Sequence, residues 1–185
     1  MKRSQQILVV CHCLLNANAK VSPLAVYPGA LMETLLPFLQ QGVGLVQLPC
    51  PESAYLGINR WGMSREQYDH PRFRRHCRQI LMPIMDQLET FCAAGCAIAG
   101  VVGADGSPNC GVNQVPLGLK GGVIGAGESA DAQAERLEMA PGTGVFMTVF
   151  KQLMAERQIA ATFMAVDENH PGQLMSEERK GDSGK

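Results

Sequence analysis

The sequence predicts an α/β protein built on a Rossmann-like open parallel sheet of about 4–5 strands, with helices on both faces. Apolar, β-branched runs alternate along the chain with amphipathic segments of helical spacing, which is the order expected of βαβ units. The apolar runs lack an apolar–polar alternation, as strands buried on both faces do. With 185 residues, the chain is long enough for one domain with its own core.

Four apolar runs are predicted to be buried strands, and a Gly-rich run is predicted to be a fifth, shorter one. The strands are expected at residues 7–11, 45–49, 96–104 and 159–167, with the short strand at 121–127. Three helical patterns are expected at residues 24–41, 64–94 and 143–158. The order of strand and helix therefore repeats along most of the chain.

Prolines and a cap indicate where the helices begin or break. Pro28 places the start of the first helix near it. Ser64 and Gln67 have the spacing of a capping box at the start of the second helix. Pro71 and Pro83 are expected to break that helix or to reset its start.

Residues 1–170 are predicted to form a single α/β domain, because the alternating pattern runs through them without a linker. Residues 171–185 are polar and charged, and we expect them to form a disordered tail.

Composition and charge exclude several classes of function. The formal net charge is -1, which favours neither nucleic acid nor an anionic membrane as a partner. The start of the chain lacks a signal-peptide cleavage site, and no apolar stretch reaches the ~18 residues of a spanning helix. We therefore expect a cytoplasmic protein. In that reducing compartment its seven cysteines are buried hydrophobic residues, metal ligands or catalytic thiols.

Three cysteines follow three predicted strands. Cys13 lies just past the first strand, Cys50 just past the second and Cys110 beyond the third. Ligands of open parallel sheets bind outside the carboxyl ends of the strands, and neighbouring strands are only about 4.8 Å apart. Three thiolates at this edge would leave a fourth metal position open, as catalytic metal sites do. The residues alone leave two interpretations open, three buried hydrophobic cysteines or one shared metal or cluster site.

Turn-forming and proton-transfer residues surround these cysteines. Pro51 stiffens the turn after Cys50. Glu52 follows two residues after Cys50, and Asp105 and Ser107 precede Cys110. These side chains are candidates for proton transfer beside a metal site.

The three cysteine motifs together resemble those of the 2-thiouracil desulfurase (TudS) family. That family has Cys-Leu-Leu-Gly after its first strand, then Cys-Pro-Glu, then Ser-Pro-Ser-Cys-Gly. The matching pieces here are Cys13-Leu14-Leu15-Asn16, Cys50-Pro51-Glu52 and Ser107-Pro108-Asn109-Cys110-Gly111. Their order and spacing agree with the family, and the match covers roughly residues 7–115.

The resemblance implies a [4Fe–4S] cluster on Cys13, Cys50 and Cys110, with one iron free for substrate sulfur. It implies removal of sulfur from a small thiolated compound, such as a thiolated nucleobase, with release of hydrosulfide. Glu52 would then be the acid or base, and Ser107 would position the substrate. Asp105 is a rival for the role of base.

Two segments depart from the family pattern. Ala17-Asn18-Ala19-Lys20 replaces an Arg-Tyr-Asp-Gly run, and Ser53–Arg60 replaces a Gly-rich stretch with Pro-Arg. We expect both segments to line the substrate pocket, so they bear on which substrate is taken.

The remaining cysteines are expected to have structural roles. Cys11, Cys92 and Cys96 are expected to pack in the core. Cys77 lies on a helix whose arginines are expected to form a solvated basic face; these are Arg72, Arg74, Arg75 and Arg78. Trp61 and Tyr55 either stack on a planar substrate or pack on the core.

Two other functions remain open from the sequence. One is a metal-free persulfide carrier or thiol oxidoreductase that uses Cys13 or Cys110, which would need an exposed thiolate of low pKa. The other is not an enzyme but a sensor that binds zinc or a cluster.

Overall fold

The computed structural model describes residues 3–119, 121, 129, 132 and 135–177, and its centre is a five-stranded sheet of order β2-β1-β3-β6-β7. The strands are β1 (Gln6–Val10), β2 (Gly44–Gln47), β3 (Ala97–Ala104), β6 (Phe163–Val166) and β7 (Leu174–Ser176). The first four strands in this order pair in parallel, and β7 pairs antiparallel with β6. The predicted Rossmann-like α/β fold is confirmed.

Strand β1 lies at the centre of the part of the sheet that carries the candidate site. In its register, Val9 pairs with Val46 of β2 and with Val101 of β3. Residues Leu8–Val10 are fully buried, as expected of a strand with neighbours at both edges and helices on both faces. The three strands β2, β1 and β3 therefore end side by side.

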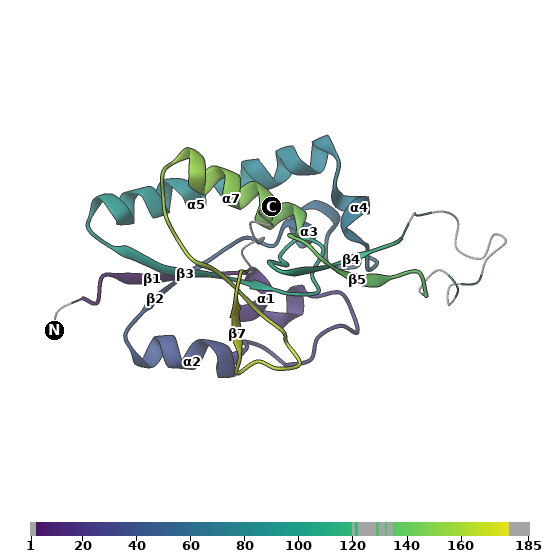
Figure 1. The fold of residues 1–185 in the computed structure, drawn as a ribbon, viewed down its shortest axis with the longest axis horizontal. Coiled ribbons are helices and arrows are strands. Elements are labelled where there is room, and N and C mark those ends of the chain that lie inside the picture. The colour runs from purple at the N-terminus through teal and green to yellow at the C-terminus, as the bar shows by residue number, and fades with distance from the viewer. Residues whose placement is uncertain (1–2, 120, 122–128, 130–131, 133–134, 178–185) are drawn as a thin grey trace, which may run out of the picture.

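Helices cover both faces of the sheet (Figure 1). The long helices are α2 (Met32–Gln40), α5 (Pro71–Ala93) and α7 (Val145–Glu156). Figure 1 shows α5 and α7 together on one face, and α2 on the other. One stripe of α5 is fully buried at helical spacing; it consists of Phe73, Cys77, Leu81, Met85 and Leu88. Burial of this stripe against the sheet holds α5 in place.

Several short elements at the carboxyl edge of the sheet were not predicted. They are α1 (His12–Leu15), the 3-10 turn η1 (Ala17–Ala19), α3 (Pro51–Leu56), β4 (Gln114–Leu117) and β5 (Glu138–Pro141); α4 (Arg65–Tyr68) lies nearby within the predicted second helix. Strands β4 and β5 pair antiparallel and extend away from the body of the molecule (Figure 1). Each of these elements is too short to show a clear period in the sequence.

Two helix boundaries differ from the prediction. The first helix begins at Met32, and Leu24 and Val26 lie instead in an exposed loop. That loop is held away from helical geometry because the Ala17 N–H donates to the Gly29 carbonyl. Pro83 lies inside α5 and does not break it. It sits on an exposed face, where water can reach the carbonyl that proline leaves unpaired.

The predicted second helix is indeed divided before Pro71. Helix α4 ends at Tyr68, and α5 begins at Pro71. Proline lacks a backbone N–H, but the first N–H groups of a helix have no intrahelical acceptor, so the fold loses no hydrogen bond there. The predicted capping pair is also present, because the Ser64 N–H donates to Gln67 Oε1 at 2.9 Å. The two prolines thus have different effects, because Pro71 starts α5 and Pro83 lies on the solvent-exposed face of the same helix.

The prediction that residues 171–185 form a disordered tail is wrong for the first residues of this range. Leu174–Ser176 form β7, so the sheet continues past residue 170. Thr34 Oγ1 also donates to the Pro171 carbonyl at 2.6 Å, which attaches this segment to α2. Backbone pairing with β6 satisfies the N–H and C=O groups of this short strand, and Leu174 packs against the core. Residues 178–185 and most of the predicted strand at 121–127 lie outside the described residues.

None of the helices in the described part of the chain combines the length and the apolarity that crossing a bilayer requires.

Candidate functional site

Three adjacent strands bring Cys13, Cys50 and Cys110 to one edge of the sheet. Cys13 lies in α1, which follows β1 after a single residue. Cys50 is the N-cap of α3, shortly after β2. Cys110 lies in the loop after β3, and the Ala104 N–H at the end of β3 donates to its carbonyl at 3.1 Å. The strand order β2-β1-β3 makes these three positions neighbours.

The three thiols lie within electrostatic reach of one another. Burial raises the pKa of Cys13 well above its usual range, and Cys110 and Cys50 raise it further. A hydrogen bond with the Cys11 thiol, together with burial, raises the pKa of Cys110, and Cys50 contributes to this shift. The strand order thus places the three cysteines at one edge of the sheet, as predicted, and their joint role in binding stays a prediction.

The loop that carries Cys110 is held by backbone hydrogen bonds to two acidic or hydroxyl side chains. Asp105 Oδ1 accepts from three consecutive N–H groups; they belong to Val112 at 2.9 Å, Asn113 at 2.9 Å and Gln114 at 3.2 Å. Ser107 Oγ accepts from the Cys110 N–H at 3.0 Å and from the Asn109 N–H at 3.3 Å. These bonds occupy the acceptor capacity of Ser107 but leave its proton for another acceptor. Both side chains fix the loop, and their roles toward a substrate stay predictions.

Glu52 is held between α3 and the Cys110 loop. Its Oε2 accepts from Arg60 Nε at 3.0 Å, and its Oε1 accepts from Asn109 Nδ2 at 3.0 Å. The Arg60 and Glu52 side chains are only 4% and 13% exposed. Beside them, the Cys50 sulfur accepts from the Ser53 N–H at 3.4 Å. The carboxylate is therefore fixed in one position close to two of the three cysteines.

Arg60 joins three segments of the site. Besides Glu52, it donates to the Ala19 carbonyl at 2.7 Å and to the Gly57 carbonyl at 3.2 Å. It lies in one of the two segments that depart from the family pattern, and Ala19 lies in the other. Sequence reasoning missed this role, because eight residues separate Arg60 from Glu52 without a helical or strand period.

Two buried polar atoms beside Glu52 have no hydrogen-bond partner in the part of the chain that the structure describes. They are Asn109 Oδ1 and the Tyr68 hydroxyl. Burial raises the pKa of Tyr68, and the nearby Glu52 carboxylate raises it further. Unpaired buried polar atoms are unfavourable unless something binds to them, so they are candidates for contact with a ligand or water.

A second polar group lies on the other side of Cys13. Lys20 and Glu168 form an ion pair, and their side chains are 13% and 14% exposed. The Tyr27 hydroxyl oxygen is 2.8 Å from Glu168 Oε1 and 3.1 Å from the Cys13 carbonyl. Burial raises the pKa of Tyr27, and the nearby Cys13 raises it further. This group could not be inferred from the sequence, because 148 residues separate Lys20 from Glu168.

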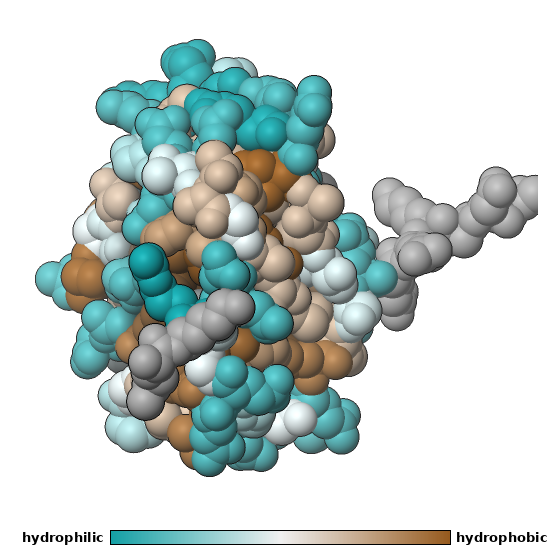
Figure 2. Space-filling model, turned by 90° about the vertical axis from the view of Figure 1, so that its left-hand side faces the viewer, coloured by the Kyte–Doolittle hydropathy of each residue, from teal (hydrophilic) through white to brown (hydrophobic). Residues whose placement is uncertain are grey.

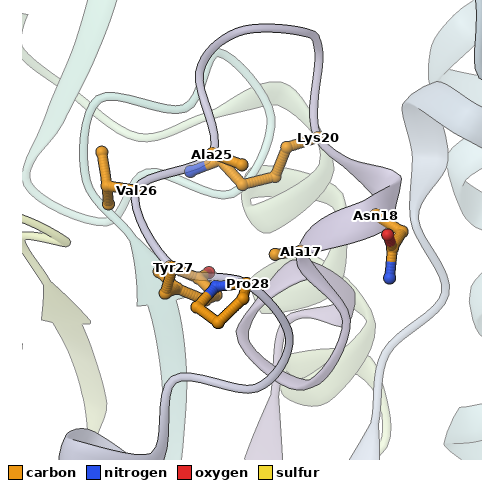
Figure 3. Close-up of a pocket in the computed structure, with 7 residues that line it drawn as sticks. All are labelled: Ala17, Asn18, Lys20, Ala25, Val26, Tyr27 and Pro28. Atoms are coloured by element: carbon orange, nitrogen blue, oxygen red, sulfur yellow. The ribbon is translucent and has the colours of Figure 1, made fainter.

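A surface depression of about 490 Å³ lies next to this group (Figure 3). Its lining comes from η1 and the loop after it; the residues are Ala17, Asn18, Lys20, Ala25, Val26, Tyr27 and Pro28. Figure 3 shows Ala17, Lys20 and the rings of Tyr27 and Pro28 around it, with the Asn18 side chain to one side. The first of the two segments that depart from the family pattern, residues 17–20, therefore lines a depression near Cys13. The second segment, Ser53–Arg60, contacts the first segment through Arg60.

Most of the other cysteines and aromatic residues are structural. Cys11 and Cys77 are fully buried, and burial raises the pKa of Cys77 to about 12. Cys92 and Cys96 are partly exposed. Cys96 still packs against the core, as predicted, whereas Cys92 is not part of it. Tyr55 packs its ring 5.1 Å from that of Phe73, whereas Trp61 is 77% exposed.

Two of the four arginines on the predicted basic face of α5 pair with acids. Arg74 pairs with Asp69 at 2.6 Å, and Arg78 pairs with Glu156 at 2.6 Å. Arg72 lies over the ring of Tyr55, 6.0 Å from its centroid. These contacts favour a structural face and leave little charge for an anionic partner.

The three cysteines supply thiol donors from one edge of the sheet. Among the described residues, no group of three or more His, Cys, Asp or Glu side chains is arranged to hold one metal ion. Three cysteines from neighbouring strand ends are the donor type that an iron–sulfur cluster takes. Cys13, Cys50 and Cys110 are the residues that would hold it.

Comparison with known proteins gives one partial relative. No protein-family model matches the chain, and no solved structure matches it significantly. A protein of Methanocaldococcus jannaschii with the name uncharacterized protein MJ0003 is 38% identical over 89 residues. The match covers 48% of this chain and 57% of that protein, so the chain spans little more than half of the relative's length. The relative's name describes no activity, and the function must be argued from the site.

Proposed function

We propose that this protein is a [4Fe–4S]-dependent desulfurase that removes sulfur from a small thiolated compound, such as a thiolated nucleobase, and releases hydrosulfide. The observation that carries the proposal is the convergence of Cys13, Cys50 and Cys110 from three adjacent strand ends. The motifs around these cysteines support it through their resemblance to the 2-thiouracil desulfurase family.

The bound cluster would supply an iron without a protein ligand, which acts as a Lewis acid toward sulfur. Glu52 is fixed by Arg60 and Asn109, and an ionised carboxylate only accepts hydrogen bonds. Glu52 is therefore suited to take a proton from the water that replaces sulfur at the substrate carbon. The unpaired Asn109 Oδ1 would accept from a ring N–H of the substrate. Ser107 retains a proton with which to donate to the substrate.

The metal-free alternative is less well supported by the thiols it requires. A persulfide carrier needs an exposed thiolate of low pKa. The pKa values of Cys13 and Cys110 are instead raised, first by burial in Cys13 and by the Cys11 hydrogen bond in Cys110. A thiolate at either position would need a metal to stabilise it.

The proposal includes a cytoplasmic location, because all seven cysteines are free and an iron–sulfur enzyme needs reduced thiols. The partner it requires is a small thiolated substrate. Its net charge of -1 gives no reason to propose a nucleic acid or a membrane as a partner.

An activity assay with a Glu52 variant tests the proposal. The protein is reconstituted with iron and sulfide without oxygen and is incubated with 2-thiouracil and other thiolated bases. We expect release of hydrosulfide and the oxo product, and a loss of about 10²- to 10⁴-fold in turnover for Glu52→Gln with unchanged iron content. Glu33→Gln, which changes an exposed carboxylate on α2, is the matched control. Unchanged turnover in Glu52→Gln would remove Glu52 from the mechanism, and no hydrosulfide from any thiolated base would contradict the activity.

A further inference from the structure

Two cysteines lie at the opposite end of the sheet from the candidate site. Cys92 is in the last turn of α5, and Cys96 directly precedes β3. Figure 2 views the side of the molecule on which α5 ends and β3 begins, and shows apolar residues gathered in the middle of this face between hydrophilic ones. Both cysteines are partly exposed there.

The turn between the two cysteines has a fixed geometry. The Cys96 N–H donates to the Phe91 carbonyl at 2.9 Å, and the Gly95 N–H donates to the Cys92 carbonyl at 2.9 Å. Gly95 has φ +84°, the left-handed conformation that closes a helix in this motif. The turn therefore folds Cys96 back toward the last turn of α5, which contains Cys92.

Both thiols line one depression of about 450 Å³. Its other walls are mostly apolar, with Glu89 and Arg157 also lining it; the apolar residues include Ile98 and Ile159. Arg157 pairs with Asp86 and Glu89, so it closes one side of the depression as part of a surface ion-pair group. Burial raises the pKa of Cys92, and the neighbouring Cys96 raises it further. Two thiols of one accessible hollow, joined by a rigid turn, are arranged to react in sequence with one small molecule.

We propose that Cys92 and Cys96 form a dithiol site that reacts with small-molecule disulfides and closes reversibly into an intramolecular disulfide. In the first step one thiolate attacks the disulfide RSSR, which forms a mixed disulfide and expels RS⁻. In the second step the other thiolate attacks the protein sulfur of the mixed disulfide and expels the second RS⁻. The two cysteine thiols are oxidised, RSSR is reduced to two RSH, and the two cysteine protons pass to the departing thiolates.

The site is independent of the proposed desulfurase activity. Cys13 and Cys110 lie at the carboxyl edge of the sheet, whereas Cys92 and Cys96 flank the amino end of β3 and share a hollow there.

Mass spectrometry of the intact, non-reduced protein after treatment with glutathione disulfide tests the proposal. We expect the wild-type protein to lose two hydrogen atoms, with free thiols falling from seven to five after denaturation. Cys92→Ser and Cys96→Ser should each retain one glutathione adduct instead, because no second thiol remains to expel it. Cys77→Ala, which changes a fully buried thiol outside both proposed sites, is the matched control and should still close the disulfide. An unchanged wild-type mass, a lasting glutathione adduct on the wild type, or loss of two hydrogens in both Cys92→Ser and Cys96→Ser would overturn the proposal.

Discussion

At the scale of single residues, Arg60 holds the candidate site together. Its guanidinium donates to the Glu52 carboxylate and to the carbonyls of Ala19 and Gly57, and it is almost fully buried. Removing one partner of a buried ion pair leaves an uncompensated charge, which commonly costs about 3–5 kcal/mol.

Arg60→Ala is therefore expected to lower the free energy of unfolding by about 2–4 kcal/mol, as measured by denaturant titration, because Glu52 still keeps the Asn109 amide. Arg78→Ala is the matched control, because it removes an exposed arginine that pairs with exposed Glu156, and it should change stability little. Equal stability of the two variants would contradict the role of Arg60.

The sequence allowed the three cysteines of the site to be predicted but not the residues that hold them. Cys13, Cys50 and Cys110 each follow a recognisable apolar strand, so the carboxyl edge of a parallel sheet could be inferred for all three. The contacts of Glu52 with Arg60 and Asn109 depend on side-chain directions in short turns. Such turns have no period from which a partner can be inferred.

At the scale of elements, the N-terminus of α7 supports the loop that carries Cys110. The N–H of Gly144 donates to the Gly111 carbonyl at 2.9 Å, and the N–H of Met147 donates to the Asn109 carbonyl at 2.9 Å. A Cβ on Gly144 would lie only 2.4 Å from the carbonyl carbon and oxygen of Asn109. Only glycine allows the helix and the loop to approach this closely.

Gly144→Ala is expected to displace this loop and to lower the free energy of unfolding by about 1–3 kcal/mol. The same variant should retain less iron after reconstitution, because Asn109 and Cys110 move together. Gly29→Ala serves as the control, since a Cβ there meets nothing within 4 Å. Full stability and full iron content in Gly144→Ala would contradict the packing described for this junction.

Helices α4 and α5 are joined by an ion-pair group that gives stability a dependence on pH. The hydrogen bond from Arg74 lowers the pKa of Asp69, and Arg65 adds to the effect. A carboxylate whose folded-state pKa lies below its unfolded value of about 3.9 stabilises the fold above that pH. The contribution is lost as the pH falls through the folded-state pKa.

Asp69→Asn should therefore lower the free energy of unfolding by about 0.5–1 kcal/mol at neutral pH. The difference from the wild type should shrink as the pH falls below about 3.9. Unfolding titrations at a series of pH values measure both quantities. A difference that stays constant with pH would show that Asp69 acts through packing and not through its charge.

At the scale of the whole molecule, one sheet separates two groups of thiols. Cys13, Cys50 and Cys110 meet at the carboxyl edge, and Cys92 and Cys96 share a hollow at the other end. The parallel sheet itself could be predicted, because buried strands such as β1 and long helices such as α5 have strong patterns. Strand β7 could not, because its three residues are too few to show a strand period.

The central claim is that the carboxyl edge of this sheet binds an iron–sulfur cluster through three cysteines. Anaerobic reconstitution with iron and sulfide, followed by iron and sulfide analysis and absorption spectroscopy, tests it most directly. We predict about four irons per chain with a broad absorption near the visible edge. Serine at Cys13, Cys50 or Cys110 should abolish stable binding, whereas Cys92→Ser should not. Well-folded protein that takes up no iron, or binding that survives all three serine variants, would contradict the account.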